Sequence, residues 1–334
     1  MKIITKGEIM NNFKKVGLTA LAGSLAAISA HAAEMTVSGA TLLTYTSEDN
    51  TEATGNPWGM KTNLGFTASG EVNGYTVSYM QTSADQFAGM SSARLSIDMG
   101  DMGTLAFDQG SGSGLGTIDD KTPTAAEEIW DGLDGATVGG LVGAAGASGV
   151  WNYIHTINGI KFNGAARKGS ATKNADGASS GAGQGAWDFA LTTDGSMVGV
   201  DGLAMGLGYG EAEVDNSGDN EHMTVFANYS AGPVTFGYQL SEIDNAGTTA
   251  VDEDVNAWGL AFNVNENLSV SYGEREVEYK NPSATNVTEE GEGVAVAYTV
   301  GSIKIAGNIN EVNHNDNSQN SKDSMTEIAV SFAF

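Results

Sequence analysis

The chain has 334 residues with 46 glycines, 4 prolines and no cysteine, and its 15 basic and 41 acidic residues give a formal net charge of −26. The lack of cysteine excludes disulfide scaffolds, thiolate metal sites and a cysteine nucleophile. The acidic surplus excludes nucleic acid as a partner, because phosphate binding needs clustered lysine and arginine. The glycines follow no Gly-X-Y period, which excludes a collagen-like chain.

Residues 1–33 have the pattern of an export signal. Four lysines precede an apolar stretch over residues 16–28, and Ala30-His31-Ala32 is an A-x-A cleavage site. This predicts a cleaved signal peptide over residues 1–33 and a mature chain over residues 34–334. A transmembrane anchor is the alternative, but the stretch is short for a span of about 20 residues. Met10 is an alternative start codon upstream of the same signal.

The mature chain alternates apolar and polar residues with a period of two, which indicates β-strands. Leu203, Met205, Leu207 and Tyr209, for example, alternate with alanine and glycine. The pattern predicts sixteen strands, at residues 35–45, 58–70, 74–81, 90–99, 103–108, 150–157, 160–168, 186–193, 203–211, 222–230, 233–242, 255–264, 267–279, 292–299, 302–310 and 324–334.

The connections between these strands are alternately long and short. The long ones are residues 46–57, 82–89, 109–149, 169–185, 212–221, 243–254, 280–291 and 311–323, and short turns such as Asn158-Gly159 separate them. A soluble sandwich has no reason to sort its loops by length, whereas an outer-membrane barrel has short periplasmic turns and long external loops. The sequence therefore predicts an all-β, sixteen-stranded antiparallel transmembrane barrel.

The two faces of the predicted strands differ in polarity. One face is apolar, as in Phe236 and Leu260, and every lysine or arginine within a predicted strand lies on the other face, as a water-filled barrel requires. Tryptophans gather at the long-loop ends of strands.

Six residues do not fit the alternation of apolar outward and polar inward positions. They are Leu42, Ile154 and Phe226 on the inner face, and Glu274, Glu276 and Glu278 on the outer face, which either lie above the membrane or are turned inward by a bulge near Gly273.

These features resemble the general porins of Gram-negative bacteria. The resemblance covers the mature chain and rests on the signal segment, the opening strand at residues 34–39, the oversized loop 109–149 and the closing strand ending in Phe332 and Phe334. It implies a bacterial outer-membrane channel for passive diffusion of ions and small hydrophilic solutes, assembled as a homotrimer and surrounded by lipid and lipopolysaccharide. The C-terminal aromatics Phe334 and Phe332 would be the signal for the barrel-assembly machinery, and the third long loop would fold into the lumen and narrow it.

The predicted constriction combines acidic loop residues with basic wall residues. The loop carries Asp119, Asp120, Glu127, Glu128, Asp131 and Asp134. The wall candidates at inward positions are Lys61, Arg94 and Lys161. The excess of carboxylates predicts a cation-preferring pore. The alternatives are an external solvated loop, and wall residues paired with Asp98, Asp108 or Asp188.

No other motif indicates a cofactor or an enzyme. Acidic runs at residues 252–254 and 289–290 could hold Ca²⁺ or Mg²⁺ loosely, or could simply be solvated. His155, His222 and His314 belong to no catalytic motif. The remaining alternatives are a solute-specific outer-membrane channel and a non-conducting barrel for adhesion or catalysis. A secreted solenoid would need an internal repeat, which is absent from the sequence.

Overall fold

A computed structural model describes residues 34–48, 55–83, 89–133, 139–146, 148–169, 185–214, 217–314, 317–318 and 321–333. The predicted signal peptide over residues 1–33, Asp134 and Phe334 lie outside these ranges.

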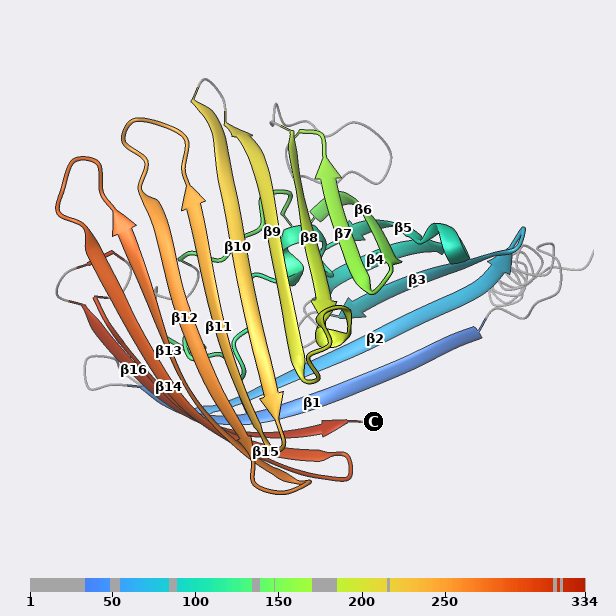
Figure 1. Ribbon diagram of the computed structural model, residues 1–334. Coiled ribbons are helices and arrows are strands. Elements are labelled where there is room, and N and C mark those ends of the chain that lie inside the picture. The colour runs from blue at the N-terminus through green and yellow to red at the C-terminus, as the bar shows by residue number, and fades with distance from the viewer. Residues whose placement is uncertain are drawn as a thin grey trace, which may run out of the picture.

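Sixteen antiparallel strands form one closed barrel in which each strand pairs with its neighbours in the chain and β1 pairs with β16 (Figure 1). The strands are β1 Glu34–Glu48, β2 Trp58–Val72, β3 Tyr75–Ser83, β4 Met90–Asp98, β5 Thr104–Gln109, β6 Ser148–Ile157, β7 Ile160–Arg167, β8 Ala186–Asp194, β9 Leu203–Val214, β10 Gly218–Ala231, β11 Val234–Asp244, β12 Asp252–Asn263, β13 Leu268–Lys280, β14 Val287–Val300, β15 Ile303–Asn313 and β16 Lys322–Ala333. Among the described residues no helix is long and apolar enough to cross a membrane.

The predicted strands and fold class are confirmed, and the main difference is length. β14, for example, begins at Val287, whereas the apolar alternation predicts a start at residue 292. The strands extend beyond the apolar pattern at their long-loop ends, because antiparallel pairing continues where both faces are polar.

Two of the short turns have sequences that favour tight β-hairpins. In Asn158-Gly159 both residues have positive φ, 50° and 82°, and Asn73-Gly74 has φ of 52° and 84°. Two consecutive positive φ values define the tight hairpin turn that matches strand twist, and asparagine followed by glycine adopts it most readily.

The inward and outward faces follow the predicted alternation. No register shift occurs around Gly273, which excludes the alternative of a bulge there, and Glu274, Glu276 and Glu278 face outward. Two lysines outside the predicted strands do not follow the inward pattern of the lysines within them. Lys280 and Lys322 lie on the outward face, in the parts of β13 and β16 that extend beyond the predicted strands.

Candidate pore constriction

The long connection between β5 and β6, residues 110–147, is here called L3. Its described parts, residues 110–133 and 139–146, follow the inner wall of the barrel. Its first limb, residues 110–133, hydrogen-bonds inward side chains on strands spread from β7 to β15. These bonds are Gly114 N to Asn163 Oδ1 (3.1 Å), Leu115 N to Asp188 Oδ1 (3.0 Å), Lys121 N to Gln239 Oε1 (2.6 Å), Ala125 N to Ser271 Oγ (2.8 Å) and Asn310 Nδ2 to the Asp131 carbonyl (2.9 Å). L3 is therefore attached along more than half of the strands.

Four inward glycines form the floor on which this limb lies. Gly237, Gly259, Gly273 and Gly293 are register partners on β11 to β14, so they lie side by side across the wall. A Cβ at Gly259 would come within 2.6 Å of the Pro123 carbonyl oxygen, and one at Gly293 within 2.9 Å of the Ile129 Cβ. None of the four has positive φ, so glycine is required here for space.

Asparagines stand at both ends of this glycine row. Asn228, the partner of Gly237, donates to the Lys121 carbonyl at 2.7 Å, and Asn310, the partner of Gly293, donates to the carbonyls of Glu128 and Asp131. The row therefore receives residues 121–131 without steric conflict and satisfies their backbone at each end.

An apolar contact anchors the start of L3. Leu115 and Ile118 are buried in one cluster with Phe226 and Ile243 of the wall. Phe226 is thus an apolar residue at an inward position because it packs against L3, which explains its departure from the polar lumen.

The second limb, residues 139–146, returns along the same strands. The Gly140 amide donates to Glu253 Oε2, the Gly143 amide to His222 Nδ1 at 3.4 Å, and the Ala145 amide to Asp188 Oδ2 at 2.7 Å. Asp188 therefore accepts from both limbs, through Leu115 and Ala145, and joins them at β8.

Arg275 joins the two limbs at β13. Its side chain is 4% exposed, lies 3.7 Å from Glu289, donates to the Gly139 carbonyl and stacks over Trp130 at 4.9 Å from the ring centroid. Sequence reasoning missed this residue, because the flanking Glu274 and Glu276 left the orientation of the segment undecided. Strict alternation from Tyr272 onward would have placed Arg275 in the lumen.

Arg94 is paired within the wall. Its guanidinium lies 3.5 Å from Asp108, which is fully buried, and also donates to the Gly112 carbonyl and to Asn152. Asp108 in turn accepts hydrogen bonds from Ser111 and Ser113 at the start of L3. This arrangement matches the predicted alternative in which Arg94 is paired with a wall carboxylate. Through its bond to Gly112 and through Asp108, Arg94 helps to fix the start of L3 to the wall.

The acidic residues of L3 are half-buried beside the lumen. Burial raises the pKa of Asp119, Glu128 and Asp131, and in Asp131 the nearby Lys61 opposes that rise. Asp120 accepts from the amide and hydroxyl of Thr122. Glu127 lines a lumenal hollow together with Lys61. L3 thus presents five described carboxylates at half-buried positions beside the lumen.

Lys61 and Lys161 lie at different heights in the barrel. Lys61 lines the same hollow as Glu127, whereas Lys161 is exposed and lies two residues after the Asn158-Gly159 turn, near the short-turn rim. Sequence reasoning did not select two further residues of this region. Lys304 lines the same hollow as Lys61, and Glu327 on β16 lies within electrostatic reach of Asp131, Glu127 and Lys61.

The acidic runs considered for cation binding do not gather their carboxylates. Alternation turns Glu253 inward toward L3 while Asp252 and Asp254 face outward, and Glu289 inward toward Arg275 while Glu290 faces outward. Across the described ranges, no three histidines or carboxylates are grouped to hold a metal ion. Phe332, the described member of the predicted assembly signal, faces outward near the short-turn rim beside Ile303.

Many solved structures share this fold, among them three outer-membrane proteins. The trimer form of OmpT, an outer membrane protein of Vibrio cholerae, has a TM-score of 0.65 and 12% identity, covering 91% of this chain and 100% of that chain. An anion-selective porin from Comamonas acidovorans has a TM-score of 0.63 and 13% identity, covering 90% and 100%. The outer membrane channel DcaP of Acinetobacter baumannii has a TM-score of 0.64 and 14% identity, covering 90% and 97%.

None of the curated proteins compared with the sequence matches it significantly. A family model described as Gram-negative porin matches residues 17–334, which is nearly the whole chain. Together with the closed sixteen-strand barrel, this match shows that the chain is an outer-membrane protein belonging to the Gram-negative porin family.

Proposed function

We propose that the protein forms a water-filled channel through which ions and small hydrophilic solutes diffuse passively, without enzymatic activity. Sixteen strands enclose a lumen too wide for side chains to fill. The observation that carries the proposal is the path of L3, which is bound along the wall from β7 to β15, while a lumenal hollow remains beside β15, β16, β1 and β2.

We propose a preference for cations at the neck. The supporting observation is the number of carboxylates beside the lumen, where Glu327 of the wall joins Glu127 and Asp131 of L3 against Lys61 and Lys304. Charged rings at a narrow point select ions by sign. Because the related porin from Comamonas acidovorans is anion-selective, the fold alone does not determine the sign.

We propose a homotrimer in which β16 and β1 to β8 form the subunit contact. OmpT of Vibrio cholerae has a trimer form. The outward faces of the described parts of these nine strands carry no carboxylate, whereas each strand from β9 to β15 carries at least one. Subunits can approach through the carboxylate-free sector without like-charge repulsion, while β9 to β15 would face lipid and lipopolysaccharide.

Recordings in planar bilayers test these proposals. The mature chain, folded and purified, should give stepwise ohmic conductance in multiples of three. The reversal potential in a salt gradient should have the sign that is expected for a cation-selective channel. A folded, heat-modifiable barrel that does not conduct would contradict the channel and favour the alternative of a non-conducting barrel for adhesion or catalysis. The C-terminal signal is tested separately, by deleting Phe334 and measuring assembly of the barrel in cells.

A further inference from the structure

A row of four inward residues crosses the wall opposite L3. Lys304 on β15 pairs with Ser331 on β16, Ser331 pairs with Leu42 on β1, and Leu42 pairs with Lys61 on β2. Neighbouring strands are about 4.8 Å apart, so the two lysine Cα atoms are separated by about 14 Å along the wall. Two ammonium groups thus flank a short stretch that has only a hydroxyl and an apolar side chain.

The floor of the hollow between them is apolar. Alanines at positions 40, 306 and 329 and the Leu42 side chain line a space of about 220 Å³ that opens to the lumen. Leu42 is one of the apolar residues that the alternation placed in the lumen. Unlike Phe226, it is not part of a cluster packed against L3, so its apolar surface lines the hollow.

A carboxylate from L3 completes the hollow on its opposite side. Glu127 belongs to the same lining as Lys61 and Lys304. Asp131 of L3 and Glu327 of the wall lie within electrostatic reach of Lys61, and Glu327 also lies within reach of Glu127. The lining of the hollow therefore has two ammonium groups from the wall, one carboxylate from L3 and an apolar floor, with the carboxylates of Glu327 and Asp131 nearby.

We propose that this hollow is a binding site for zwitterionic solutes with an apolar side chain, such as amino acids and short peptides, on their way through the pore. The solute carboxylate would bind Lys61 or Lys304, its ammonium group would bind Glu127, and its side chain would lie on Leu42 and the alanines. A simple anion can pair only with the two lysines and a simple cation only with the carboxylates, whereas a zwitterion pairs with both charges at once. The proposal rests on the channel function above and specifies its solute class.

Current block in single channels tests the site with four matched probes. These are alanyl-leucine as the zwitterion, its N-acetyl form as the anion, its C-terminal amide as the cation, and the N-acetyl amide as the neutral compound. We expect the zwitterion to block the wild-type channel at a concentration at least about tenfold below that of any other probe, because two charge-assisted hydrogen bonds form together. Equal or stronger block by the anion or the cation would overturn the proposal.

Variants locate the site. Glu127→Gln, Lys61→Met and Lys304→Met should each raise the half-blocking concentration of alanyl-leucine by about tenfold. Lys322→Met on the outward end of β16 and Glu266→Gln in the β12–β13 turn are matched controls that should leave it unchanged. Equal effects of controls and lining variants would place the block elsewhere and overturn the proposal. Conductance without any block refutes this inference alone, whereas a silent barrel refutes the channel function.

Discussion

Arg275 is one of the two wall residues, with Asp188, that join the two limbs of L3. Replacing it by methionine removes the partner of Glu289, which is 3% exposed, and the donor to the Gly139 carbonyl. Breaking a buried ion pair on one side costs about 3–5 kcal/mol. We expect Arg275→Met to lower the unfolding midpoint in denaturant and to change the single-channel conductance, because the second limb of L3 loses its hold on β13.

The double variant Arg275→Met/Glu289→Gln separates the charge effect from the loss of packing. It should recover part of the stability, because a neutral amide then replaces the buried carboxylate that has lost its arginine beside Tyr279. Lys280→Met on the outward face is the control. Its partners Glu242 and Asp254 are about 41% exposed, so the loss should be below about 1 kcal/mol. Equal losses for Arg275→Met and Lys280→Met would contradict the role of Arg275.

The carboxyls of L3 predict how ion selectivity depends on pH. Burial raises the pKa of Asp119, Glu128 and Asp131 above the ordinary carboxyl values, so these groups bind protons at a higher pH than exposed carboxyls do. As the pH falls from 7, they lose their charge first, and cation preference should decline before exposed carboxyls titrate near pH 4. The stability of the fold should change in the opposite direction and rise as the pH falls, because protonating these groups relieves the penalty of burying their charge.

Reversal potentials measured in a salt gradient at successive pH values test this prediction. The triple variant Asp119→Asn/Glu128→Gln/Asp131→Asn should remove the part of the pH dependence that precedes the titration of the exposed carboxyls. The variant Asp201→Asn in the β8–β9 connection keeps all L3 charges and should follow the wild type. An unchanged pH profile in the triple variant would mean that these carboxyls do not control the current.

At the scale of secondary elements, the glycine row is the feature that gives L3 room. The extended backbone at Gly293 tolerates a side chain, but its Cβ would lie 2.5 Å from Asn310 Oδ1, which belongs to the anchor of L3 on β15, and 2.9 Å from Ile129 Cβ of L3. Gly293→Ala should therefore leave the barrel folded and move L3 toward the lumen, which lowers the single-channel conductance. Gly291 provides a matched control on the same strand and face, because a Cβ there meets nothing closer than 3.6 Å. Equal conductance of the two alanine variants would contradict this function of the row.

The strands could be predicted from sequence because their pattern is local. Alternation defines a strand wherever one face meets lipid and the other meets water, and the turn residues then fix the order. The path of L3 could not be derived in this way, since it depends on contacts such as Lys121 with Gln239, which are 118 residues apart in the chain. One signal was present and unused, namely the inward glycines at 237, 259, 273 and 293.

The constriction was predicted by residue type more reliably than by position. The five described acidic residues of L3 lie half-buried beside the lumen, but Arg94 is paired with Asp108 and Lys161 lies near the rim. The sign of each residue's charge follows directly from the sequence. The height of that residue along the barrel axis depends instead on the strand register around the whole wall. Lys304 and Lys61, which belong to β15 and β2, become neighbours only because β1 and β16 close the barrel.

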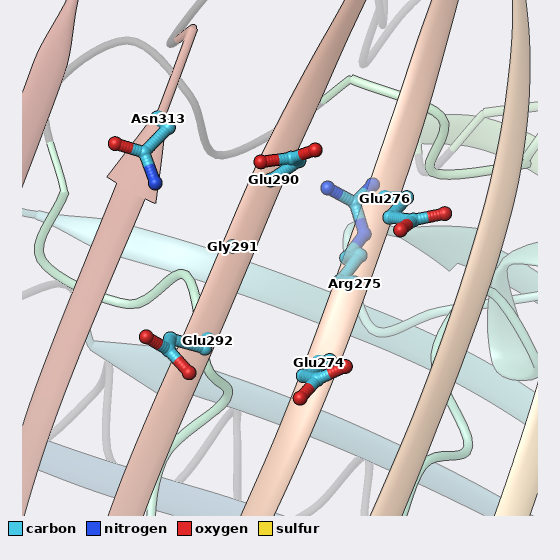
Figure 2. Close-up of a pocket in the computed structure, with 7 residues that line it drawn as sticks. All are labelled: Glu274, Arg275, Glu276, Glu290, Gly291, Glu292 and Asn313. Carbon is cyan, nitrogen blue, oxygen red and sulfur yellow. The ribbon is translucent and has the colours of Figure 1, made fainter.

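At the scale of the whole molecule, carboxylates gather on one sector of the outer surface. On β13 and β14 the register places Glu274 opposite Glu292 and Glu276 opposite Glu290, and Figure 2 shows these four side chains around one surface pocket. The hydroxyl of Tyr272 bridges Glu274 and Glu292 at 2.6 and 2.7 Å. Like charges placed directly opposite each other on adjacent strands destabilise a sheet.

This arrangement predicts that salt stabilises the barrel. Raising the ionic strength from 0.01 to 0.15 M shortens the screening length from roughly 30 Å to about 8 Å, which weakens the repulsion between facing carboxylates. The net charge of −26 acts in the same direction. We expect the urea midpoint of the folded, detergent-solubilised protein to rise with NaCl over this range, whereas a barrel held together by surface ion pairs would lose stability.

The pair-specific part of the effect is tested by Glu276→Gln/Glu290→Gln. This variant removes one facing pair and should be more stable than the wild type at low salt, by on the order of a few tenths of a kcal/mol, with a smaller gain on adding salt. Asp201→Asn/Glu266→Gln makes the same change in net charge in two short turns, where no carboxylate pairing occurs in the register. If both double variants respond to salt alike, net charge governs the barrel's stability. A larger change for Glu276→Gln/Glu290→Gln assigns the repulsion to the outward faces of β13 and β14, where lipopolysaccharide would lie in the proposed assembly.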